Sequence, residues 1–161
     1  MLSMHSVVTS TLEGAALEAW RSYLQSHASI LRELDAELLA RHAMTARDYE
    51  VLLYLAQAEQ RRLPMSSLAE RTMLTRSGIT RLVDGLVEGG LVARVSCPSD
   101  ARISYAELTD AGYERLREAG CTQVAIINRL FLERFDPDEI EVLASLLRRL
   151  PGAHQGSCTV S

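Results

Sequence analysis

The stretch that is most informative about the fold is LTRSGITRLVDGLVEGGLVAR, residues 74–94. Thr75 is a residue type that caps helix N-termini, and Gly89-Gly90 ends the helical pattern before a short β-prone run. Apolar residues recur at i, i+3, i+4 and i+7, which places four of them on one face of a helix: Ile79, Leu82, Val83 and Leu86. The stretch therefore predicts an amphipathic helix with one buried side.

The opposite side of this helix is polar. It carries Arg76 in the first turn, followed by Ser77, Thr80, Arg81, Asp84 and Glu88. Gly78 and Gly85 each cost roughly 1 kcal/mol relative to alanine in a helix interior, so propensity alone does not hold the segment helical. Packing of the apolar side has to stabilise the helix.

The composition indicates a soluble protein that has no membrane partner. The chain has 161 residues, 47% of them hydrophobic, which is enough for one compact domain or a small lobe with long helices. No run approaches the roughly 18 to 20 apolar residues that cross a bilayer, and residues 1–14 lack a secretory signal pattern. We therefore expect a cytoplasmic location.

The charge of the chain is unevenly distributed. The formal net charge is -4, and all seventeen basic residues are arginine. Residues 60–110 contain seven arginines against six acidic residues, a net of +1, whereas the rest of the chain has a net of -5. An excess of one charge does not indicate nucleic-acid binding by itself, so the positions of the arginines have to decide.

Three helices are expected before residue 74. In residues 13–41 a seven-residue repeat of leucine predicts a long amphipathic helix: Leu17, Leu24, Leu31 and Leu38. Thr45 is expected to cap a second helix over residues 47–58. Residues 60–64 are interpreted as a loop, and Ser67 with Glu70 has the spacing of a capping box, which predicts a short third helix ending near Thr72.

A hairpin and two helices are expected after residue 90. The β-prone runs 91–95 and 102–108 flank a loop that contains Pro, Ser and Asp, a pattern typical of a β-hairpin. Thr109 is expected to cap a fifth helix that runs to about Phe135. Asp136-Pro137 predicts the start of a sixth helix, because proline suits the first helical position.

A short helix, a tight turn, a helix with a polar outer face and a β-hairpin follow one another as in a winged helix-turn-helix. In this order and spacing the chain resembles the MarR family of bacterial transcription regulators. The resemblance rests on Leu68-Ala69, on ITRLVDGLVEGGLVAR at 79–94, on SCPSDARISYAELT at 96–109 and on TDAG at 109–112.

The resemblance implies a mainly α fold with a small β-hairpin wing. The winged helix-turn-helix lobe would span residues 45–110 and lie between an N-terminal dimerisation helix, 13–42, and C-terminal dimerisation helices, 110–150. Residues 1–12 would be a flexible N-terminus and 151–161 a disordered tail. The implied function is sequence-specific binding of double-stranded DNA by a homodimeric, ligand-responsive repressor on a palindromic operator.

The residues expected to contact DNA lie mainly in helix 76–88 and in the hairpin that forms the wing. Arginine bonds bidentately to guanine, and hydroxyl groups near a helix N-terminus donate to phosphate. The alternative for Arg76 and Arg81 is an exposed arginine paired with Asp84 or Glu88. The candidate set is Ser66, Ser67, Thr75, Arg76, Ser77, Thr80, Arg81, Arg94, Asp100 and Arg102.

In the wing, the family places an arginine in the minor groove and braces it with an aspartate. Asp100 and Arg102 match that pair, and a surface ion pair that closes the hairpin is the alternative. The sequence has Gly85 and Ala101 where the family often carries basic residues. Both changes remove positive charge from the expected DNA face, and we expect weaker binding and a wing that inserts less firmly.

Regulation is less visible in the sequence. Many members of the family bind small aromatic or phenolic acids between the dimerisation helices and the DNA-binding lobe. The candidate ligand contacts are Trp20, His27, Arg47, Asp48 and Tyr49, each of which is also an ordinary core or surface residue type. A thiol-responsive regulator is an alternative, with Cys97 in the wing loop, although the first helix has no cysteine.

Other classes of function fit the sequence less well. It has no nucleophile elbow, no phosphate-binding glycine loop and no histidine-acid cluster, so we expect no enzyme, no catalytic residues and no cofactor. The four histidines have no spacing typical of a metal site. A winged-helix protein-interaction module is the stronger rival, and it predicts exposed apolar residues on the polar side of helix 76–88.

Overall fold

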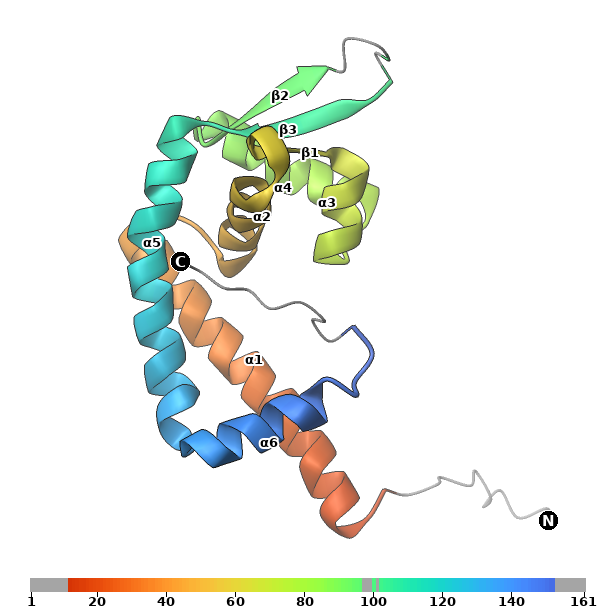
Figure 1. Ribbon diagram of the computed structural model, residues 1–161, viewed down its shortest axis with the longest axis vertical. Coiled ribbons are helices and arrows are strands. Elements are labelled where there is room, and N and C mark those ends of the chain that lie inside the picture. Colours follow the sequence, from red (N-terminus) through yellow and green to blue (C-terminus); the bar gives the residue numbers. More distant parts are fainter. Residues whose placement is uncertain (1–11, 97–99, 101, 153–161) are drawn as a thin grey trace, which may run out of the picture.

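The computed structural model describes residues 12–96, 100 and 102–152 (Figure 1). The helices are α1 Gly14–His42, α2 Ala46–Gln57, α3 Met65–Thr72, α4 Arg76–Glu88, α5 Asp110–Leu130 and α6 Pro137–Leu147. The strands are β1 Arg62–Pro64, β2 Val92–Ser96 and β3 Ser104–Leu108. Two short 3-10 turns are Glu59–Arg61 and Leu132–Arg134. The expected flexible terminus and disordered tail lie almost wholly outside the described residues.

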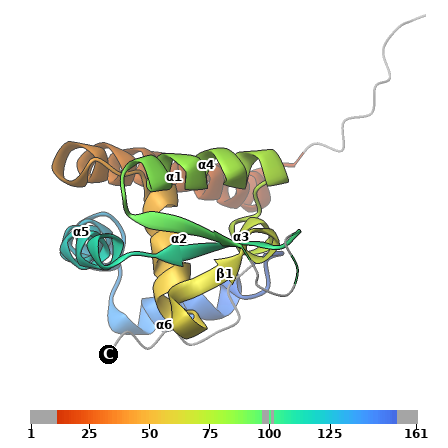
Figure 2. The same cartoon turned by 90° about the horizontal axis from the view of Figure 1, so that it is seen from above.

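The molecule has two parts, which are arranged one above the other in Figure 1. The upper part contains α2, α3, α4 and the three strands, and the lower part contains α6 and most of α1 and α5. Seen from above, α5 and α3 lie at opposite ends of the short sheet, with α4 along one side (Figure 2). The predicted mainly α fold with a small β wing is confirmed.

The apolar side of α4 is buried as its spacing predicts. Ile79, Val83 and Leu86 are 1%, 0% and 4% exposed, and Leu82 is half-buried. They pack in one core with residues from α2, α3 and the sheet: Val51, Leu52, Leu55, Leu68, Val92, Ala106 and Leu108. Full burial of one such side chain stabilises the fold by roughly 1.5 to 3 kcal/mol, which offsets the two glycines inside the helix.

The N-terminus of α2 is held by three side chains. Thr45 Oγ1 accepts a hydrogen bond from the Asp48 N–H, and the Asp48 carboxylate accepts one from the Thr45 N–H at 2.7 Å. Asp35 of α1 accepts a third from the Ala46 N–H at 2.7 Å. The predicted cap at Thr45 is therefore confirmed, and the Asp35 contact ties the end of α1 to the start of the lobe.

Residues 60–64, expected as a loop, are instead a 3-10 turn followed by strand β1. The strand order is β1-β3-β2, and β1 pairs antiparallel with β3 through Leu63↔Ala106. Three residues are too few for a periodic pattern, and the strand forms because β3 presents an otherwise unpaired edge. Pro64 is tolerated because β1 is itself an edge strand.

The capping box expected at Ser67 does not form. Helix α3 begins at Met65 with Pro64 at the cap position, and no side chain caps it. Because β1 ends at Pro64, the pairing of that strand sets where the helix starts, two residues before the local signal. The end of α3 at Thr72 agrees with the prediction.

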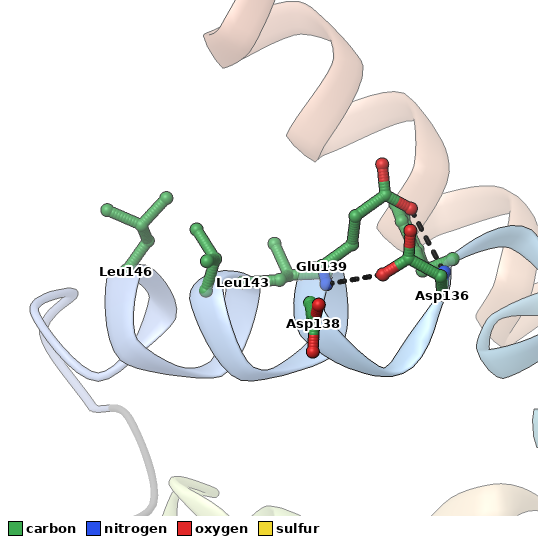
Figure 3. A pocket seen from close by; sticks show the side chains of 7 residues that line it. Asp136, Asp138, Glu139, Leu143 and Leu146 are labelled. Atoms are coloured by element: carbon green, nitrogen blue, oxygen red, sulfur yellow. Dashed lines mark hydrogen bonds between the residues drawn. The ribbon is translucent and has the colours of Figure 1, made fainter.

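The C-terminal helices start where the sequence predicts, but α5 is shorter. It begins after the cap at Thr109 and ends at Leu130 rather than near Phe135, because residues 132–134 form a 3-10 turn. Asp136 and Glu139 form a reciprocal capping box at the start of α6, and Pro137 takes the first helical position (Figure 3). Across the described residues, no helix is long and apolar enough to span a bilayer.

Gly112 of α5 packs closely against Leu91, just before β2, and against Leu108 of β3. A Cβ at this position would lie 2.1 Å from the Leu91 carbonyl oxygen and 2.7 Å from Leu108 Cδ1. We expect Gly112→Ala to lower the free energy of unfolding by about 2 to 3 kcal/mol, because neither the backbone nor the buried leucine can yield. Urea unfolding at a fixed protein concentration measures the change.

Gly85→Ala is the matched control, since a Cβ there meets no atom within 4 Å. We expect this change to raise stability by about 1 kcal/mol through helix propensity alone. Equal stability of the two variants would contradict the packing described for Gly112.

Candidate nucleic-acid interface

One depression gathers four of the predicted contact residues. Ser66, Arg76, Thr80 and Arg102 line it together, although they come from α3, α4 and the wing. Its remaining lining residues are Pro64, Met65, Ile79, Ile103 and Ser104. Sequence spacing relates none of these elements, so their convergence on one surface is a property of the fold.

The N-terminus of α4 contributes hydroxyl groups and free backbone donors. Thr75 Oγ1 accepts from the Gly78 N–H at 3.1 Å, which confirms the predicted cap, and lies 3.2 Å from Ser77 Oγ. Both side chains are exposed. A helix N-terminus carries partial positive charge and attracts phosphate, so this end of α4 suits an anion.

Arg76 and Arg81 are exposed, and within the described part of the chain neither forms a hydrogen bond or an ion pair. Asp84, one of the two expected alternative partners of these arginines, instead accepts two hydrogen bonds from Arg94, at 2.8 and 3.1 Å. The two guanidinium groups are therefore available to a ligand.

Arg94 has a different position from the other predicted contacts. Its guanidinium reaches from β2 to Asp84 of α4 and to the Thr80 carbonyl oxygen at 3.4 Å. The side chain is 33% exposed. It links the wing to the helix, a role that the sequence did not reveal because the two partners are ten residues apart in separate elements.

In the wing, Asp100 and Arg102 form the predicted pair. Arg102 donates from Nε at 3.0 Å and from Nη2 at 3.1 Å to the Asp100 carboxylate, and its backbone N–H donates to the same group at 3.0 Å. These hydrogen bonds lower the pKa of Asp100, while the Arg102 side chain stays 90% exposed. Cys97 and Ala101 lie outside the described residues.

The two serines of α3 differ in exposure. Ser66 is exposed and lines the depression, whereas Ser67 is half-buried one residue further on. Both lie in the first turn of α3, where backbone N–H groups lack helical partners.

The five candidate effector contacts do not lie together. Trp20 and His27 line an apolar cleft between α1 and the C-terminal helices. Arg47 pairs with Glu50 and bonds to the Thr72 carbonyl oxygen, and Asp48 is part of the α2 cap. Tyr49 lies against Gly120, and burial raises the pKa of its phenol.

Comparison with known proteins identifies the family. The MarR family profile matches residues 42–103. The chain is 33% identical to Sco3205 of Streptomyces coelicolor, a MarR family transcriptional regulator solved in complex with DNA, with a TM-score of 0.82 over 86% of this chain and 90% of that chain. The chain belongs to the MarR family.

Two further MarR family comparisons agree. AbsC of Streptomyces coelicolor is 30% identical with a TM-score of 0.82, over 88% of this chain and 95% of that one. The transcriptional repressor YetL of Bacillus subtilis is 25% identical over 92% of this chain and 90% of its own length. The chain is therefore a MarR family transcriptional regulator, and the relatives it matches are regulators rather than enzymes.

The wing pair has a measurable titration. The Asp100 carboxylate has a lowered pKa because it is bound to Arg102. The ion pair therefore stabilises the folded wing fully at pH values above the ordinary carboxyl pKa, and this stabilisation is lost as pH falls through the lowered pKa. We expect Arg102→Ala to raise the pKa of Asp100 towards its ordinary value, as followed by carboxyl carbon chemical shifts.

Salt provides the control for this titration. The Arg102 side chain is almost fully exposed, so about 1 M NaCl should also raise the pKa of Asp100 in the unchanged protein. An Asp100 pKa that is the same with and without Arg102 would contradict the pairing.

Proposed function

We propose that this MarR family regulator binds double-stranded DNA sequence-specifically, as a homodimeric repressor on a palindromic operator. The observation that carries the proposal is that Arg76 and Arg81 are exposed on α4 and have no partner among the described residues, and that Arg76 lines one depression with Arg102. Of the carboxylates near this surface, Asp84 is paired with Arg94, and Asp100 is paired with Arg102, whose side chain remains 90% exposed.

In this proposal α4 enters the major groove, where Arg76 and Arg81 bond to base edges. The hydroxyl groups of Ser66, Thr75 and Thr80 donate to phosphates, as do Ser77 and Ser67 beside them. Arg94 contributes chiefly by bracing the wing against α4.

Arg102 reaches the minor groove in this arrangement. Its side chain extends from the wing almost fully exposed, and Asp100 orients the guanidinium through two hydrogen bonds. A narrow A·T-rich groove has enhanced negative potential and would attract this cation.

A protein partner suits this surface less well than DNA. Helix α4 is described throughout, and none of its large apolar side chains is exposed. Protein interfaces concentrate apolar and aromatic side chains at their centre, whereas DNA interfaces are polar and positively charged. The outer side of α4 is polar and carries arginines, as a DNA interface does.

The proposed dimer covers an apolar surface that one chain leaves open. Of the 29 residues of α1 only Leu34 and Leu38 are buried, and none of the 11 residues of α6 is. Large apolar side chains that remain exposed on these helices are Trp20, Tyr23, Leu24, Leu31, Leu39, Val142 and Leu146. A second copy would remove this area from water, which drives association.

The shape of this surface also favours a second copy. An apolar cleft of about 740 Å³ separates α1 from α6, and Leu143 and Leu146 project from one side of α6 (Figure 3). A two-fold dimer carries two copies of α4, which explains why a palindromic operator is proposed. Repression is proposed by analogy with YetL.

Ligand response is part of the proposal. Trp20, Tyr23 and His27 form a ladder of stacked rings along the cleft, with centroids 6.4 and 6.2 Å apart. A small aromatic or phenolic effector enclosed there between two protomers would shift the relative positions of the two lobes. The remaining candidate contacts lie in the first turn of α2, in the DNA-binding lobe that the effector would move: Arg47, Asp48 and Tyr49.

The DNA contacts are tested by a mobility-shift assay on the duplex that flanks the protein's own gene. We expect Arg76→Ala with Arg81→Ala to weaken binding roughly thousandfold or more, because each bidentate contact contributes about 1 to 3 kcal/mol and the dimer loses both contacts twice. Arg117→Ala is the control, since Arg117 is paired with Glu114 on α5. Unchanged affinity of the double variant, or no binding by the unchanged protein at low salt, would reject the proposal.

The dimer is tested by the single tryptophan of the sequence, Trp20. Its side chain is 51% exposed in one chain, so we expect its emission to shift to longer wavelength on dilution as protomers separate. Leu146→Asp should give the long-wavelength emission at all concentrations and a monomer mass by sedimentation, because the charge lies in the proposed interface.

Ala111→Asp is the matched control, because Ala111 is exposed in the first turn of α5, away from the cleft. This variant should remain dimeric. A monomeric mass of the unchanged protein at micromolar concentration would contradict the dimer.

A further inference from the structure

A second depression lies on the β1 edge of the lobe, beside the one already described. Arg62, Arg71 and Tyr105 line it, together with Gln57, Ala58, Glu59, Gln60 and Leu63. Its residues come from the end of α2, the following turn, β1, α3 and β3. Two arginines thus converge here from segments that are separate in the chain.

Both guanidinium groups rest on aromatic rings rather than on carboxylates. The Arg62 guanidinium carbon lies 5.5 Å from the Tyr105 ring centroid, and that of Arg71 lies 5.6 Å from the Tyr54 ring centroid. Stacking on a ring holds the guanidinium plane and leaves its N–H edges free to donate. Within the described residues, neither arginine forms an ion pair.

Among the described residues, no acidic group of this region forms an ion pair with the two arginines. Glu50 is bound to Arg47 and Tyr54, and Asp110 to Arg61. Glu59 lies on the rim, and Glu107 is opposite Arg62 in the sheet register, yet neither lies within ion-pair distance of the two guanidinium groups. A free anion is therefore the ligand that this depression suits.

The second depression continues the first along the same two strands. On β1, Arg62 and Leu63 line the second depression and Pro64 lines the first. On β3, Tyr105 lines the second depression and Ser104 lines the first. Two residues of a strand cover roughly 7 Å, about the axial length of two nucleotides. A DNA backbone that leaves the first depression can therefore follow β1 into the second.

We propose that Arg62 and Arg71 form a phosphate-binding site for the DNA backbone that flanks each half-site. The inference rests on the proposed function and extends it, since it adds contacts beyond α4 and the wing. The site binds phosphate oxygens and no base edge, so it increases affinity and the length of DNA covered without changing sequence preference. It supplies positive charge to the lobe in a family member that lacks a basic residue at Gly85.

The test compares the full-length protein with the double variant Arg62→Ala, Arg71→Ala on duplexes of increasing length around one operator. We expect the unchanged protein to gain affinity when flanking base pairs are added and the double variant to lack this gain. The variant should bind operator and unrelated DNA at least tenfold more weakly, with an unchanged ratio between them. The slope of log affinity against log salt should become shallower by about 0.9 for each phosphate that the variant no longer neutralises.

Two controls separate charge from fold. Arg62→Lys with Arg71→Lys keeps the charge and should retain most of the salt dependence, whereas Arg117→Ala should change neither affinity nor slope. Circular dichroism and the melting temperature check that each variant is folded. A folded alanine double variant with the affinity, slope and length dependence of the unchanged protein would overturn the inference and leave the proposed function intact.

The source of the phosphate is tested separately with inorganic phosphate in the absence of DNA. If millimolar phosphate raises the melting temperature of the unchanged protein but not of the double variant, while both gain equally from flanking DNA, the site serves a small anion and the DNA inference is wrong. If the unchanged protein binds no duplex at all, the proposed function fails first, which distinguishes the two failures.

Discussion

The burial of one side of α4 is the constraint on which the rest of the lobe depends. Ile79, Val83 and Leu86 are almost completely removed from water, and they pack against side chains from α2, α3 and the sheet. A helix with glycine at 78 and 85 is weak in isolation, so its position is set by this packing and not by its own propensity. Fixing the buried side also fixes which residues of α4 face outward.

The charges around α4 are arranged so that some arginines brace the structure and others stay free. Arg94 bonds to Asp84 and joins the wing to the helix, and Asp100 orients Arg102 at the wing. Arg76 and Arg81 are left without partners in the described part of the chain. Placing carboxylates on the bracing arginines lets an acidic protein present a locally positive surface.

In the lower half of the molecule, local signals define a helix that its own chain does not bury. Helix α6 has a complete capping box and a proline at its first position, so its start is defined locally. Nevertheless, no residue of α6 is buried by its own chain, and Arg129 of α5 is paired with Glu33 and Glu37 of α1 at the periphery. Local signals are enough to form the helix, but its apolar side chains can be buried only against an apolar surface outside the single chain.

The sequence by itself determined those features that arise from interactions within about four residues. The caps at Thr45, Thr75 and Thr109, the start of α6 at Asp136-Pro137 and the apolar side of α4 were predicted and form as expected, because hydrogen bonds and periodicity of this kind are local. The tertiary structure alone decided the third strand, the early start of α3, the partner of Arg94 and the convergence of Ser66, Arg76 and Arg102. Each of these depends on contacts between segments far apart in the chain, and no spacing rule in the sequence encodes such distances.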